Sequence, residues 1–171
     1  MQNIRLYFND LGFDVEPISD TIFLAQKKGR HFMFLKFTDY YFVRHDENLS
    51  AEKIKDCHET SKIIANKDFK LPKSLRLTVP NINTVFITES NITEEVASFV
   101  KKRSFDFIGG QQDSIFLIDR LSSKMYCAGR EYSHISGEAK LIWGNSKDFK
   151  KINGHNRSYQ LMTNLFNSLY K

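Results

Sequence analysis

The sequence predicts an α/β protein, with a central mixed β-sheet flanked by helices. Strand-like segments follow a first helical segment, and helical and strand-like segments then alternate, which is typical of a mixed sheet with helices on its faces. The length of 171 residues, of which 41% are apolar, suffices for one packed core. No repeat, low-complexity run or linker interrupts the chain, so residues 1–171 are expected to form a single domain.

The N-terminal part is expected to form a helix and a meander of strands. Ile4, Tyr7, Phe8 and Leu11 have the spacing of one helix face, and Gly12 follows as a C-terminal glycine. Apolar residues then predict strands at 13–18, 21–25 and 31–37, with 40–43 as a candidate for a further strand. The Lys-Gly-Arg segment at 28–30 is predicted to form a turn between the second and third strands.

The rest of the chain alternates between helical and strand-like patterns. Ser50 is a plausible N-cap for a helix that ends near residue 66, and a basic loop, 67–76, leads to a strand at 75–79. A buried strand at 84–88 precedes a helix through Val96, Phe99 and Val100. A strand at 114–119 with a hairpin partner at 124–128 follows. The inward-facing residues of a last helix, 155–170, are Tyr159, Met162, Phe166 and Leu169.

This element order resembles that of the restriction-endonuclease-like nuclease superfamily. The residues that carry the resemblance lie between 4 and 87, and they include a helix that ends in Gly-Phe-x-Val (Gly12 to Val15), then a hairpin, a helix and a buried strand. The resemblance implies an α-β-β-β-α-β core, to which this chain adds a C-terminal hairpin and helix. In active members an acidic residue on one strand and a Glu/Gln-x-Lys triplet on the next hold Mg²⁺ and help to activate water.

Two alignments place the implied site differently. In the first, Lys36 matches the lysine of the triplet, but Phe34 and Ile22 stand where the metal ligands belong, so the site would be inactive. In the second, Asp20 is the acidic residue, Gln26 and Lys28 belong to the triplet, and Mg²⁺ would be the cofactor. The second alignment requires Asp20 and Gln26 to share a strand, whereas the family separates them onto neighbouring strands. A basic surface turn is therefore the favoured interpretation of 27–30.

The positive charge admits either nucleic acid or an acidic protein as the partner. The net charge is +5 and the isoelectric point is near 9.1. Further basic residues lie at 67–76 and 147–151, and clusters that converged in space could neutralise several phosphates. The candidate binding residues are Lys27, Lys28, Arg30, Lys101, Lys102 and Arg103.

Other residue types favour structural roles. The five histidines lack the spacing of a zinc site, and Cys57 and Cys127 are expected to be unpaired, buried thiols. Glu89 and Asp119 end strands, where α/β proteins place functional residues, but turn or cap chemistry explains them equally well. With no signal-like or membrane-spanning segment in the sequence, a soluble, cytoplasmic protein is expected.

The sequence thus favours a non-enzymatic binding protein, with no cofactor, on a degenerate nuclease-like core. Its partner is expected to be a protein. By analogy, a small basic protein with an inactive site is similar to the toxin-neutralising (immunity) and accessory proteins of bacterial competition and defence systems. The alternative is a metal-dependent nuclease, or a nucleic-acid-binding protein, of the restriction-endonuclease-like superfamily.

Overall fold

A mixed β-sheet between two layers of helices forms the framework of the protein. The computed structural model describes residues 1–31, 35–69, 78–102, 107–108, 111–141 and 153–170. These residues form a nine-stranded sheet in the order β1-β2-β3-β4-β6-β7-β8-β9, with β5 pairing with β6. The strands are β1 (Asp14–Pro17), β2 (Ile22–His31), β3 (Leu35–His45), β4 (Thr78–Thr88), β5 (Phe107–Ile108), β6 (Gln111–Asp119), β7 (Lys124–Cys127), β8 (Arg130–Ser133) and β9 (Ala139–Leu141). The described helices are α1 (Gln2–Asp10), α2 (Ala51–Asn66), α3 (Glu94–Lys102) and α5 (Asn153–Ser168).

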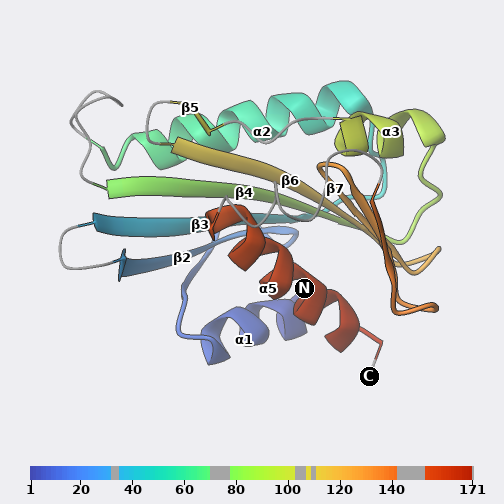
Figure 1. Ribbon diagram of the computed structural model, residues 1–171, viewed down its shortest axis with the longest axis horizontal. Coiled ribbons are helices and arrows are strands. Elements are labelled where there is room, and N and C mark those ends of the chain that lie inside the picture. Colours follow the sequence, from blue (N-terminus) through green and yellow to red (C-terminus); the bar gives the residue numbers. More distant parts are fainter. Residues whose placement is uncertain (32–34, 70–77, 103–106, 109–110, 142–152, 171) are drawn as a thin grey trace.

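The centre of the sheet is parallel and its flanks are antiparallel. Strands β3, β4 and β6 run parallel, whereas β2 pairs with β3, and β7 with β6, in antiparallel register. Parallel strands need cover on both faces. Figure 1 shows that α2 and α3 cover one face of the sheet and α1 and α5 cover the other. The predicted fold class, a mixed sheet flanked by helices, is therefore confirmed.

The many aromatic residues fill the core on the α1/α5 face. Phe8 of α1 packs against Phe13, Phe23 and Tyr41, with ring centroids 5.2 to 5.8 Å apart. Phe166 of α5 is fully buried in the same cluster. On the α2/α3 face one smaller, more aliphatic cluster consists of Ile54, Phe86, Val96, Ala97, Val100, Ile115, Leu117 and Tyr126. A further cluster under the last turn of α2 consists of Tyr40, Phe42, Ala65 and Ile82.

Most of the local signals for the helices are confirmed. Ser50 caps α2, because its hydroxyl accepts a hydrogen bond from the backbone N–H of Lys53 at 3.1 Å. Met162 and Phe166 are buried, as expected for the inner face of α5. The two cysteines, Cys57 and Cys127, are free thiols as expected, although Cys57 is only half-buried. None of the described helices is both long and apolar enough to cross a membrane.

The expected turn at 28–30 is wrong, because these residues lie inside β2. Strands β2 and β3 pair from Ile22–Arg44 to His31–Leu35, so the segment at 40–43 belongs to β3 as well. Gly29 pairs with Phe37, and a Cβ atom at Gly29 would lie 2.2 Å from the Phe37 ring. The glycine therefore makes room for a cross-strand aromatic ring and does not form a turn. The strand expected at 75–79 falls partly outside the described residues, and β4 runs unbroken from Thr78 to Thr88.

The glycine after α1 gives a test of the local chain reversal. Gly12 has φ +74°, and among the described residues the one atom within 4 Å of an added Cβ is Lys27 Nζ at 3.7 Å, an ordinary contact. Gly12→Ala should therefore lower the free energy of unfolding by about 1–2 kcal/mol through backbone strain alone. Gly12→Asn should cost less, because asparagine tolerates the left-handed region. Urea unfolding of both variants measures the difference, and equal losses would contradict this explanation.

Candidate functional site

A broad groove of about 770 Å³ opens at the β2–β3 end of the sheet, on the face that α2 covers. Gln26, Lys28 and Arg30 of β2 line it, together with Lys36, Thr38 and Tyr40 of β3. Asp68 and Phe69, which follow α2, close one side. We call this feature the basic groove.

Strand alternation and hairpin register assemble the basic groove. Every second residue of a strand points to the same face, so Lys28 and Arg30 lie about 6.8 Å apart along β2. The register pairs Arg30 with Lys36 and Lys28 with Thr38. Three cationic side chains therefore stand on one small area of a strand surface.

The cations of the basic groove are free of acidic partners. Within the described part of the chain, no hydrogen bond or ion pair engages the side chains of Lys28, Arg30 or Lys36. The carboxylate in the groove, that of Asp68, accepts a hydrogen bond from the Tyr40 hydroxyl at 2.8 Å. Gln26 Nε2 is buried and has no partner among the described residues. The groove thus combines excess positive charge with an unused amide donor.

The structure brings together four of the residues proposed from sequence and separates the others. Gln26, Lys28, Arg30 and Lys36 share the basic groove. Asp20 is exposed in the connection between β1 and β2, outside the groove. The alternative alignment, with Asp20, Gln26 and Lys28 in one metal site, therefore lacks its acidic member at the groove. Phe34 and Arg103 lie outside the described residues.

The remaining proposed cations are used elsewhere in the fold. Lys27 points to the opposite face from Lys28, where its ammonium donates to the Leu11 carbonyl at 2.6 Å. Lys101 of α3 pairs with Glu94 at 3.0 Å and lies 3.7 Å from Glu131 of β8. Lys102 is exposed at the end of α3. The basic clusters at 27–30 and 101–102 therefore do not converge.

The first alignment of the nuclease residues is also corrected. Ile22 pairs with Arg44, whereas Lys36 pairs with Arg30 at the other end of the hairpin. Ile22 and Lys36 cannot belong to one site, because β2 and β3 are longer than the sequence patterns indicated. Ile22 instead lines a smaller pocket, of about 190 Å³, together with Phe42 and Arg44.

A buried polar group lies beneath α2 and was not found from sequence. His58 is fully buried, and its Nε2 lies 3.0 Å from Asp113 Oδ2. A carboxylate can only accept, so Nε2–H donates to Asp113, and Nδ1 faces the Thr84 hydroxyl at 2.7 Å. The spacing of His58 from Ile54 and Ser61 is a helix-face signal, but Asp113 lies 55 residues away, and no local pattern pairs the two.

A second buried polar group joins α5 to the sheet. Arg157 donates through Nε and Nη2 to the two carboxylate oxygens of Asp39, at 3.0 and 2.5 Å. Asn81 Nδ2 donates to Asp39 at 2.9 Å and to Ser158 Oγ at 2.9 Å. These contacts hold the N-terminal half of α5 on β3 and β4, so a structural role accounts for them.

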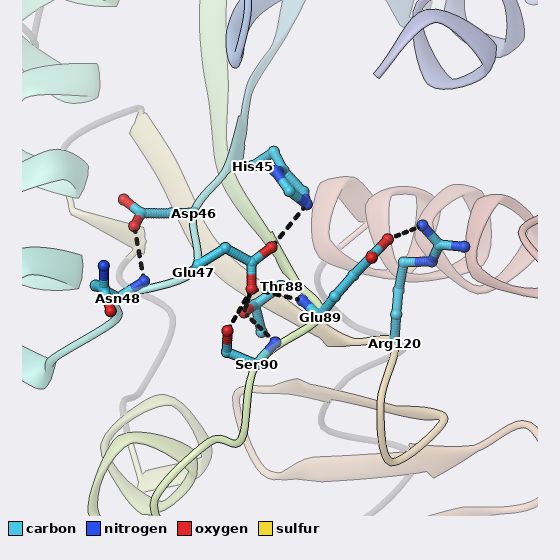
Figure 2. A network of polar contacts seen from close by, with 8 residues as sticks. All are labelled: His45, Asp46, Glu47, Asn48, Thr88, Glu89, Ser90 and Arg120. Carbon is cyan, nitrogen blue, oxygen red and sulfur yellow. Dashed lines mark hydrogen bonds and ion pairs between the residues drawn. The ribbon is translucent and has the colours of Figure 1, made fainter.

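The carboxyl ends of β3, β4 and β6 carry a network of polar side chains, shown in Figure 2. Glu47 accepts from the Ser90 hydroxyl, from Glu89 N–H at 3.3 Å, and from His45 at 3.1 Å. Glu89 in turn pairs with Arg120. This network ties the connections after β3 and β4 together, so its carboxylates are already engaged.

The Asp119 carboxylate stabilises the turn that follows β6, which is one of the roles that the sequence analysis proposed for it. Its two carboxylate oxygens accept from the backbone N–H of Ser122 at 3.0 Å and from the Ser122 hydroxyl at 2.5 Å.

Among the described residues, no three His, Cys, Asp or Glu side chains are grouped as a metal site would require. Comparison of the chain with protein-family models and with curated proteins returned no match.

The strand-end network makes a prediction about the pKa of Glu47. The Ser90 hydrogen bond, aided by the charge of His45, holds this pKa below its ordinary value. A lowered pKa means that the contribution to stability is present above the unfolded-state pKa and is lost as the pH falls through the folded-state pKa. Ser90→Ala should therefore raise the pKa of Glu47 towards its ordinary value.

Carboxyl-detected NMR titration measures this pKa directly. Ser98→Ala is the matched control, because Ser98 donates to Glu94 at 2.9 Å and does not contact the network. The control should leave the pKa of Glu47 unchanged. An unchanged pKa in Ser90→Ala would show that the serine does not stabilise the Glu47 carboxylate.

Proposed function

We propose that this protein is a non-enzymatic binding protein whose binding surface is the basic groove. The observation that carries the proposal is the set of three cations, Lys28, Arg30 and Lys36, that stand together without acidic partners among the described residues. Like charges held this close repel one another, and an anionic partner would relieve that repulsion. Such complementarity mainly raises the association rate and the specificity of a partner.

The proposal includes a degenerate nuclease-like core. The order α1, β1, β2, β3, α2, β4 supports the resemblance to the restriction-endonuclease-like superfamily. In the observed register, Ile22 of β2 faces Arg44, and Phe42 lies two residues before Arg44. If residues 42–44 correspond to the family's Glu/Gln-x-Lys triplet, then the apolar side chains of Ile22 and Phe42 replace the metal-binding residues, and Arg44 is the cation in place of the lysine. Such a set would repel Mg²⁺ rather than bind it.

An acidic protein surface is the partner that we favour for the basic groove. The biological class that fits is a toxin-neutralising (immunity) or defence-accessory protein of bacteria, which acts by covering a surface and needs no chemistry of its own. Co-expression with the product of the neighbouring gene, followed by assay of that product's toxicity, tests this class. Tight 1:1 association that abolishes toxicity would support it.

Charge removal tests the groove itself. The triple variant Lys28→Gln, Arg30→Gln and Lys36→Gln should bind a fluorescent polyglutamate peptide at least tenfold more weakly than the wild type at low salt, by anisotropy. The matched control removes the same charge elsewhere, at the exposed residues Lys55, Lys102 and Lys140. The control should retain most of the affinity. Equal losses in both variants would assign binding to net charge and overturn the groove as the site.

The alternative function is a nucleic-acid-binding protein or nuclease. The spacing of Lys28 and Arg30 along β2 and the half-buried ring of Phe69 beside them favour it, because phosphates and bases need cations and aromatic platforms. Plasmid DNA incubated with Mg²⁺ or Mn²⁺ separates the two functions. We expect no cleavage. Cleavage that is abolished by Lys36→Ala or Asp20→Ala would replace the binding proposal with an enzymatic one.

A further inference from the structure

A second pocket lies on the same face of the sheet as the basic groove, between α2 and the first residues of β2. Its volume is about 190 Å³. Its apolar walls are Ile18, Ile22, Phe42, Ile64 and Phe86. Ile18 and Ile64 are 53% and 37% exposed, so the apolar surface reaches solvent at the rim of the pocket. A concave apolar wall with few polar groups is the usual form of a small-molecule site.

One cation faces this apolar pocket. Arg44 lines it, is half-buried, and contacts the Cys57 sulfur through Nη1. No carboxylate of the described residues forms an ion pair with Arg44. Asp46, the nearest acidic residue along the chain, is engaged by Lys53 at 2.8 Å. A guanidinium partly shielded from water by apolar walls favours an anion, since it loses solvation without gaining a counter-charge.

The other polar groups of the pocket are already committed. The Ser61 hydroxyl donates to the Cys57 carbonyl at 2.9 Å, and the Thr60 hydroxyl donates to the Asp56 carbonyl at 2.9 Å. The Thr84 hydroxyl is held by His58 at 2.7 Å. Burial raises the pKa of the Cys57 thiol, although Arg44 opposes this, so the thiol stays protonated and uncharged near neutral pH. Arg44 is therefore the strong donor that the pocket offers to a ligand.

We propose that this pocket binds a small aliphatic carboxylate. The carboxylate accepts two hydrogen bonds from the Arg44 guanidinium, and a branched alkyl group packs against Ile22, Phe42 and Ile64. The volume corresponds to about six water molecules, which suits a branched acid of roughly six carbon atoms. The proposal is independent of the basic groove, because the two openings have different lining residues.

The same chemistry can come from two sources, a free acid or the C-terminal carboxylate of a peptide that ends in leucine. Both present a branched alkyl group next to a carboxylate. The probes are therefore 4-methylpentanoate and its uncharged amide, and a short peptide ending in leucine with a free or an amidated C-terminus. A peptide with a free C-terminus that binds more tightly than the free acid would assign the pocket to a protein terminus.

NMR titration of the wild type is the first test, with the backbone amides of Arg44 and Thr84 as reporters. We expect the acid to bind at least tenfold more tightly than the amide, because only the acid carries the charge that Arg44 recognises. Binding of both probes with equal affinity, or of neither acid nor free peptide, would overturn the proposal. This comparison needs no variant, so a folding defect cannot obscure its result.

Variants then locate the binding. Arg44→Gln should remove the preference for the acid, and a thermal melt confirms that the variant is folded. Ile64→Ala should weaken binding several-fold by removing part of the wall. Ile63→Ala is its matched control, because Ile63 is a neighbour on α2 that is 62% exposed and does not line the pocket. Equal effects of the two isoleucine variants, or an unchanged preference in Arg44→Gln, would place the ligand elsewhere.

Discussion

The structure depends on a mismatch of length between α2 and the strands that it covers. Helix α2 has 16 residues and is about 24 Å long, whereas β3 has 11 residues and extends about 36 Å. The helix begins after the carboxyl end of β3, and its last turn packs Ala65 against Tyr40 and Ile82. The part of the β2–β3 hairpin that precedes Tyr40 on β3, together with the residues of β2 that pair with it, therefore projects past the end of the helix. Among the described residues, no helix covers the α2-side face of this part of the sheet, and the basic groove is that face.

Polar side chains on the two faces of the sheet at β2, β3 and β4 find their partners in different ways. On the α5 face, Asp39 and Asn81 are almost fully buried, and Arg157 and Ser158 of the helix supply their partners. On the α2 face at the same level, no helix residue in the described part of the chain supplies partners, and the exposed side chains there include the cations Lys28, Arg30 and Lys36. Each polar side chain thus matches the cover that its face receives, since a buried charge without a partner is costly.

Local signals sufficed for the helices, because caps and apolar periodicity depend on near neighbours, but the parallel strands β3 and β4 are each one unbroken strand where two shorter segments were predicted. Ser50 and Gly12 marked helix ends correctly. Gly29 led to the wrong prediction of a turn at 28–30, because a glycine that accommodates a facing aromatic ring looks the same in sequence as a glycine in a turn. That error displaced the hairpin register and, with it, both alignments of the nuclease-like residues. The buried pair of His58 and Asp113 could not be predicted, since it exists only after α2 packs on β6.

The positions of the two openings on the α2 face underlie our proposal that both bind anions. Arg44 and Tyr40 are four residues apart on β3, a separation of about 13 Å, and the apolar contacts of Tyr40, Phe42, Ala65 and Leu24 lie between the openings. A divalent cation would need several carboxylates within reach, yet the carboxylate of the basic groove, Asp68, is held by Tyr40, and the lining of the second pocket includes none. Along this face the cations Lys28, Arg30, Lys36 and Arg44 therefore meet no opposing charge from the described residues. A surface built in this way selects anionic groups at both openings, and the apolar walls beside Arg44 add a preference for a carboxylate that carries an alkyl group.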